Sequence, residues 1–394
     1  MQTIKSLLTA TLLGWLSHCC SQSNFSECMA AVERNNQSLL AARKSADAAR
    51  LAARTGIGPE DPELAIQYLF GSPADAGDQL ELLAVQRFDL PMVYHKKRQL
   101  ADLGGVLSER SLAMERRQIL SAASQLLMNI VFLNRQATLF SRQEAVWANW
   151  VNHEERQLSR GASGMLALRK AQMQHLEVRQ LAAKNQLALQ ECLLQLKGIN
   201  GGVPLVFRDT VYPGFPDPAS LDSLEQAIEA ADPELQQLEV ERQLAEQHLS
   251  LASLQQLPQL EAGYRHQSLL GQRYHGLHAG LSLPLWENKG KRAARRAELA
   301  AADARLNAHR QEHHASIQQM YDRQKLLRDQ LSTFREAFDQ DGVDLLLEKA
   351  YLLGEWSSRE YFQELAFYQE RRRQLLELEW EYMSALARLS EYRL

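Results

Sequence analysis

The stretch Leu281-Ser-Leu-Pro-Leu-Trp286 ends a segment of alternating apolar and polar residues. Gly290-Lys-Arg292 then opens a long proline-free run rich in Ala, Arg, Glu and Leu. The alternation predicts a β-strand, and the run after it predicts a helix. The same transition occurs earlier, at Phe88-Asp-Leu-Pro91 followed by Lys96-Lys-Arg98. The prolines of the two stretches lie 193 positions apart (284 − 91 = 193).

The same offset of 193 positions relates further landmarks. It carries Gly161 in Leu158-Ser-Arg-Gly161 onto Gly354 in Tyr351-Leu-Leu-Gly354, and it carries Leu196 onto Leu389. Similarity at a fixed offset indicates a duplicated structural unit. We therefore expect one architecture built from two halves, each a strand pair that leads into a very long helix.

The composition of the chain favours long helices and excludes one class of partner. The chain has 394 residues, a formal net charge of −4 and 7% aromatic residues. Ala, Leu, Gln, Glu and Arg are abundant, as is typical of long helices. Because the charge balance is slightly acidic, we expect no nucleic-acid partner.

The first 23 residues have the features of an export signal, namely Lys5 and a short apolar run over 6–16. Leu16-Ser-His-Cys19 approximates a lipoprotein cleavage box, although His18 stands where a small residue is expected. Lipidation of Cys19 and simple cleavage near Ser21 therefore both remain open.

The first half, residues 24–200, predicts four elements separated by glycine and proline. They are a helix over 24–56, a β-hairpin over 62–90, a helix of about 67 residues over 92–158, and a helix of about 35 residues that ends near Lys197. At 1.5 Å per residue the long helix would measure roughly 100 Å. A tunnel or a coiled coil needs that length, whereas a globular domain does not.

A Gly- and Pro-rich linker over 201–220 precedes the second half, residues 221–394, where the order repeats. The expected elements are a helix over 221–256, a hairpin over 258–284, a long helix to about Leu352 and a last helix from about Ser357. In the second hairpin one face is apolar (Leu277, Ala279, Leu281, Leu283) and the other is small or polar (Gly276, His278, Gly280, Ser282).

The strands are the candidate membrane segments. No later stretch holds 18 consecutive apolar residues, so no membrane-spanning helix is expected. Strands with one apolar face suit a barrel wall between lipid and water, although a soluble hairpin packed on a core remains an alternative. Four strands cannot close a barrel, and open edges are not tolerated in hydrocarbon. We therefore expect a mainly α chain with membrane β-strands, in which each protomer gives four strands to a trimeric 12-strand β-barrel continued by a long α-helical coiled-coil barrel.

These features together resemble the TolC-type outer-membrane efflux protein family over essentially the whole mature length. The duplicated transitions at Phe88–Pro91 and Leu281–Trp286 carry the resemblance, together with Gly290-Lys-Arg292 and Tyr351-x-x-Gly354. The resemblance implies a homotrimer in the outer membrane of a Gram-negative bacterium, extending into the periplasm. It also implies outer-membrane lipid, a periplasmic adaptor (membrane fusion protein) and an inner-membrane pump as partners.

Three segments are similar to the branch that works with heavy-metal resistance-nodulation-division pumps for cobalt, zinc, cadmium or copper. They are Gly58-Pro-Glu-Asp-Pro62, Tyr68-Leu-Phe-Gly71-Ser-Pro73 and Gln86-Arg-Phe-Asp-Leu-Pro91. The function implied is an exit duct for heavy-metal cations. The alternatives are a duct for drugs or for type I protein secretion, and a periplasmic coiled-coil scaffold.

The resemblance also places a gate at the periplasmic end, where the last helix begins. Tyr351 matches the family's tyrosine three residues before the glycine, and Glu360 matches the first acidic gate position. Gln363 stands at the second acidic position, which makes the implied ring less negative. Three copies of a carboxylate around a narrow pore would concentrate cations. The alternative for Glu360 is a solvated helix face or an ion pair.

No other motif indicates catalysis or a metal. The sequence lacks a phosphate-binding loop, His-Glu-x-x-His and Gly-x-Ser-x-Gly, so we expect no enzyme and no cofactor. His275 and His278 lie three apart in a strand and diverge, as do the adjacent helical pair His313 and His314. Cys28 and Cys192 have no metal-binding spacing, and no metal site is expected.

Basic residues follow each hairpin, at Lys96–Arg98 and over 289–296. Helix solubility explains them, and contact with anionic lipid head groups is the alternative.

Overall fold

The computed structural model describes residues 24–218, 220–284, 286, 288–338 and 343–394. The expected signal over 1–23 and the lipidation candidate Cys19 lie outside these ranges. The chain forms two compact units. Among the described residues, a helical unit comprises 24–39, Arg116–Ala227 and Ser316–Leu394, and a sheet unit comprises Leu40–Glu115 and Ile228–Ala315.

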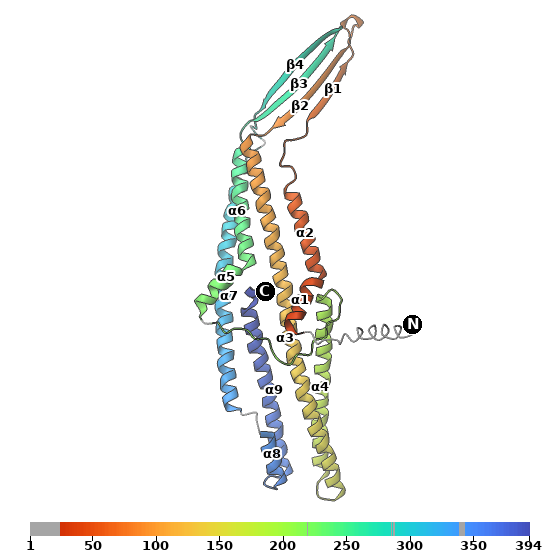
Figure 1. Cartoon of the computed structure of the whole chain (residues 1–394), viewed down its shortest axis with the longest axis vertical. Helices are drawn as coiled ribbons and strands as arrows, with labels where there is room; N and C mark the ends of the chain where they lie inside the picture. The colour runs from red at the N-terminus through yellow and green to blue at the C-terminus, as the bar shows by residue number, and fades with distance from the viewer. Residues whose placement is uncertain (1–23, 219, 285, 287, 339–342) are drawn as a thin grey trace, which may run out of the picture. The chain divides into compact units, whose positions relative to one another are not determined.

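The sheet unit contains one antiparallel sheet of four strands, which lie side by side in the order β1-β2-β3-β4 (Figure 1). The strands are β1 (Glu63–Leu69), β2 (Gln79–Phe88), β3 (Gln259–Leu269) and β4 (Gln272–Ser282). Each half of the sequence supplies one hairpin, as expected. The two hairpins join through the pairing of β2 with β3, which places Val85 opposite Gly263.

The second hairpin closes with a two-residue turn at Leu270 and Gly271. Both residues have positive φ, 51° and 79° respectively. Positive φ at both central positions is the turn geometry that matches the twist of antiparallel strands. Glycine adopts it without strain, whereas Leu270 requires support from the pairing around it.

The register gathers most of the apolar strand residues on one side, which we call the apolar face, whereas Leu69, Leu83, Val85 and Leu269 lie on the other side. One row across the sheet is Leu64, Ala84, Tyr264 and Leu277. The side chains of this face are open to solvent, because Leu277 is 94% exposed and Leu64 is 70% exposed. Leu64, Ile66 and Tyr68 of β1 share this face.

The other side, which we call the charged face, carries every charged strand residue except Arg273. Arg87 lies between two carboxylates, with its Nε 2.8 Å from Glu261 and an Nη 3.5 Å from Glu63. Arg265 pairs with Glu81 at 2.5 Å. These cross-strand ion pairs make this side the more polar of the two.

Two expected helices are each broken in two. The helix expected over 24–56 is divided into α1 (Phe25–Asn35) and α2 (Gln37–Ala53). The helix expected over 221–256 is divided into α5 (Leu221–Ala231) and α6 (Pro233–Leu254). Asn36 leaves the helical region with ψ 119° and caps Leu39 through its side chain. Asp232 caps α6, whose first residue is a proline that cannot continue α5.

The long helices follow the expected order with adjusted ends. They are α3 (Pro91–Ser159), α4 (Met165–Ile199), α7 (Lys291–Ala337), α8 (Val343–Leu352) and α9 (Ser358–Leu389). The expectation of one helix from 285 to about 352 is wrong, since α7 ends at Ala337. The sequence Asp339-Gln-Asp-Gly342 that follows is poor in helix formers. None of the helices within the described ranges has an apolar stretch long enough to cross a membrane.

The helical unit has its largest core where α1, α3 and α4 meet. Leu127, Ile130 and Leu196 are fully buried there together with Cys28. Burial raises the pKa of the Cys28 thiol to about 11, so this cysteine is protonated at neutral pH and behaves as a small hydrophobe. Phe207, from the expected linker, is buried in the same core.

Candidate functional site

Two helix ends of the helical unit have the same geometry at positions 193 residues apart. Gly161 and Gly354 both adopt positive φ, 71° and 72°. Glycine has no side chain that would strain this conformation. The amide of each glycine donates to the carbonyl three residues back, at 3.0 Å in both cases. The next amide donates to the carbonyl five residues back, which completes a Schellman motif. The duplication therefore extends to individual backbone hydrogen bonds.

Tyr351 lies in the last turn before the second of these helix ends and contacts α3. Its hydroxyl is 3.1 Å from Nε2 of His153. The ring of Trp150 packs against both residues, with centroid distances of 5.3 Å to Tyr351 and 4.7 Å to His153. Phe362, near the start of α9, meets the Trp150 ring edge-on at 3.9 Å. An aromatic cluster thus joins α3, α8 and α9, and Tyr351 belongs to it.

Glu360 has a different environment. It is the N3 residue of α9 and forms a capping box with Ser357. The Ser357 amide donates to Glu360 Oε2 at 2.9 Å, and the Glu360 amide donates to Ser357 Oγ at 3.4 Å. The carboxylate therefore satisfies the first turn of its own helix. Gln363 is exposed one turn further along α9.

The aromatic cluster borders a groove of about 840 Å³ in the helical unit. Tyr351 lines it, whereas Glu360 and Gln363 are not among the described lining residues. The described lining includes no carboxylate and five basic side chains, namely Arg135, Arg142, His153, Arg156 and Arg372. The groove is thus aromatic at one side and positively charged overall.

The sequence analysis identified Tyr351 but missed its partners. Trp147, Trp150 and His153 recur every three residues, which places them on one side of α3. That spacing was available in the sequence. Their pairing with Tyr351 joins positions 198 apart, and local patterns do not show such contacts.

The histidine pairs considered from the sequence are not brought together. His275 lies opposite His266 in the sheet, with 3.1 Å between their Nδ1 atoms, while His278 approaches Glu261 on the charged face at 3.8 Å. His314 is exposed. His313 instead faces Asp232 of the sheet unit, at 3.6 Å.

No family model and no curated protein matches the sequence. Solved structures match at high coverage. CusC, which forms a transmembrane channel, has a TM-score of 0.72 and 18% identity, over 93% of this chain and 91% of CusC. The outer membrane protein VceC of Vibrio cholerae has a TM-score of 0.74 and 14% identity, over 93% and 95% of the two chains. The Campylobacter jejuni outer membrane channel CmeC has a TM-score of 0.71 and 14% identity, over 95% and 86%. The chain therefore has the TolC-type fold that these outer-membrane proteins share.

Proposed function

We propose that the chain is one protomer of a trimeric exit duct in the outer membrane, extending into the periplasm. The two-sided sheet carries this proposal. Its apolar face exposes Leu277, Leu64 and Ile66 to 94%, 70% and 65%, a pattern suited to lipid contact. Its charged face suits a wet interior.

The unpaired edges of the sheet support a trimer. Among the strands that the structure describes, β1 and β4 each have a neighbour on one side only. Their free backbone groups cannot remain unpaired in hydrocarbon. Three chains would pair every β4 with the β1 of the next chain and close a barrel of twelve strands, within the known range for such barrels.

The proposed exported substrate of the duct is a heavy-metal cation, because the sequence resembles the branch that works with heavy-metal pumps. Deleting the gene should raise sensitivity to zinc, cobalt, cadmium or copper and leave sensitivity to dyes and detergents unchanged. The reverse pattern would assign the duct to drugs. A periplasmic adaptor and an inner-membrane pump are the proposed partners, and co-purification with them tests that assignment.

Tyr351, Glu360 and Gln363 are proposed to act at the periplasmic gate. The hydrogen bond from Tyr351 to His153 and the surrounding rings fix α8 against α3, so they would hold a closed arrangement of these helices. We expect Tyr351→Phe to raise the open-channel current in a planar bilayer. His153→Ala should have the same effect, because it removes the same bond. Currents equal to wild type in both variants would show that the bond between Tyr351 and His153 does not hold the channel closed.

Two substitutions of Glu360 separate its charge from its capping role. Glu360→Gln keeps the capping box, because glutamine serves at N3, and removes the charge. We expect it to lower the preference for cations over anions without changing the open probability. Glu360→Ala removes both and should also raise the open probability, since the Ser357 amide at the start of α9 loses its acceptor. Unchanged ion selectivity in both variants would show that the charge of Glu360 does not act on ions in the pore.

A further inference from the structure

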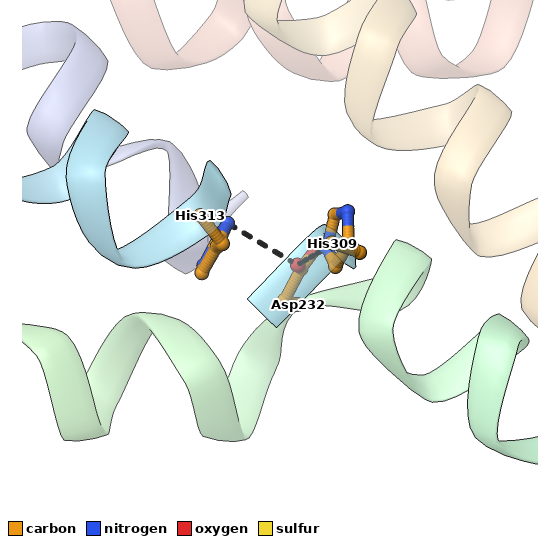
Figure 2. Close-up of side chains that lie close together, drawn as sticks. All are labelled: Asp232, His309 and His313. Atoms are coloured by element: carbon orange, nitrogen blue, oxygen red, sulfur yellow. Dashed lines mark hydrogen bonds and ion pairs between the residues drawn. The ribbon is translucent and has the colours of Figure 1, made fainter. Parts of the chain in front are cut away.

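Three ligand-type side chains of the sheet unit converge at the start of α6 (Figure 2). His309 and His313 come from α7, and Asp232 comes from the junction of α5 and α6. Oδ2 of Asp232 lies 3.2 Å from Nε2 of His309 and 3.6 Å from Nδ1 of His313. The three ligand atoms lie within 4.8 Å of one another.

The local sequence aims these groups at one point. His309 and His313 are four residues apart, so they occupy the same face of α7 on successive turns. Asp232 is fixed by its capping role, because its Oδ1 accepts from the Glu234 amide at 3.2 Å. That bond leaves Oδ2 directed to the imidazoles, as Figure 2 shows.

The site is largely removed from water. The side chain of Asp232 is 6% exposed, and those of His309 and His313 are 15% and 16% exposed. Nε2 of His313 is buried and has no hydrogen-bond partner among the described residues. The ring nitrogen of His313 that faces Asp232 is Nδ1, so this unpartnered Nε2 is not one of the three converging ligand atoms.

The spacing of the ligand atoms suits a small divalent ion. Tetrahedral zinc with bonds of about 2.0–2.1 Å places its ligand atoms about 3.3 Å apart. The two ligand distances from Asp232, 3.2 and 3.6 Å, bracket that value. Two imidazoles and one carboxylate form a three-ligand set that leaves a fourth position for water or another ligand. Oε1 of Glu234 lies 3.7 Å from the other nitrogen of His309, where an outer carboxylate orients a metal-binding imidazole.

We propose that Asp232, His309 and His313 bind one divalent transition-metal ion of the zinc class in each chain. The ion would link the start of α6 to α7 within the sheet unit. This site is independent of which substrate the duct exports, so the test of metal binding does not depend on the proposed substrate.

The test uses the full chain, purified in detergent without a histidine tag and stripped with a chelator. Zinc is titrated against a chromophoric competitor, and Co²⁺ is added separately as a probe of coordination. We expect one zinc per chain and the strong visible absorption of four-coordinate Co²⁺. His309→Gln and His313→Gln should each weaken zinc binding at least tenfold, since even outer-shell changes at zinc sites have effects of about 10–100-fold.

Asp232→Asn is the decisive variant, because asparagine caps helices as well as aspartate does and so preserves the fold. It should also weaken zinc binding at least tenfold while the circular dichroism spectrum is unchanged. His314→Gln, one residue along the same helix, is the matched control and should bind like wild type. Zinc binding below one per chain in the wild type, equal affinity in Asp232→Asn, or an equal loss in His314→Gln would each overturn the proposal.

Discussion

Leu277→Arg should prevent the protein from accumulating in the outer membrane. Leu277 is 94% exposed midway along the edge strand β4, on the apolar face and in the row with Leu64, Ala84 and Tyr264. An arginine on a lipid-facing strand costs about 2–4 kcal/mol near the middle of the bilayer, and a trimer would carry three. The measurement is immunoblotting of sucrose-gradient membrane fractions, followed by the yield of detergent-resistant oligomer.

His278→Arg is the matched control, because it adds the same side chain one residue along β4 on the opposite face. His278 already approaches Glu261 at 3.8 Å, and an arginine there gains a carboxylate partner. It should reach the membrane at the wild-type level. If Leu277→Arg and His278→Arg fractionate alike, the apolar face does not contact lipid.

Glu379→Ala should cause the largest loss of stability in the helical unit. The Glu379 side chain is 9% exposed and joins three helices, because its two carboxylate oxygens meet Arg135 of α3 at 2.7 Å and Arg335 of α7 at 2.6 Å. Breaking a buried ion pair from one side costs about 3–5 kcal/mol. We expect about 3 kcal/mol, the low end, because Arg335 is 56% exposed and water screens its pair.

The measurement for Glu379→Ala is a urea titration followed by helical circular dichroism. Glu381→Ala is the control, since Glu381 lies two residues away on α9 and meets Arg323 at 4.0 Å with both side chains well exposed. An exposed pair of this kind contributes at most about 1 kcal/mol. Equal midpoints for the two variants would show that the buried carboxylate does not hold the three helices together.

The sequence predicted the repeated architecture because the signals were local and appeared twice. Gly161 and Gly354 both end helices in the left-handed region, where glycine is favoured, so their offset of 193 positions pointed to equivalent structures. The alternating hairpins fixed which residues share a face. The pairing of β2 with β3, which joins the halves, required the folded chain.

The breaks at Asn36 and Asp232 were not predicted, although both residues are good helix caps. An apolar pattern at helical spacing continues across each of them, and it outweighed the capping signal. Asp232-Pro233 was the clearer case, since proline favours the first turn of a new helix.

In each candidate site, some residues had a local signal in the sequence, whereas their partners lie far away along the chain. Tyr351 was predicted because the resemblance matches it to the family's tyrosine three residues before Gly354, whereas its partner His153 lies 198 positions away in the sequence. For the metal site, the spacing of four between His309 and His313 was visible in the sequence. Asp232, 77 positions earlier, completes the set only after α5, α6 and α7 have packed.

Cysteines placed on the two edge strands test the trimeric barrel most directly. Within one chain β1 and β4 are separated by two strands, or about 14 Å at 4.8 Å per interval, which is too far for a disulfide. Ile66→Cys on β1 is combined in turn with cysteine at positions on the same face of β4, namely 273, 275, 277, 279 and 281. Oxidised membranes should give a covalent trimer for at least one pair on a non-reducing gel, and each single variant should give monomer. A monomer for all five pairs, recovered from the periplasm without detergent, would contradict the account.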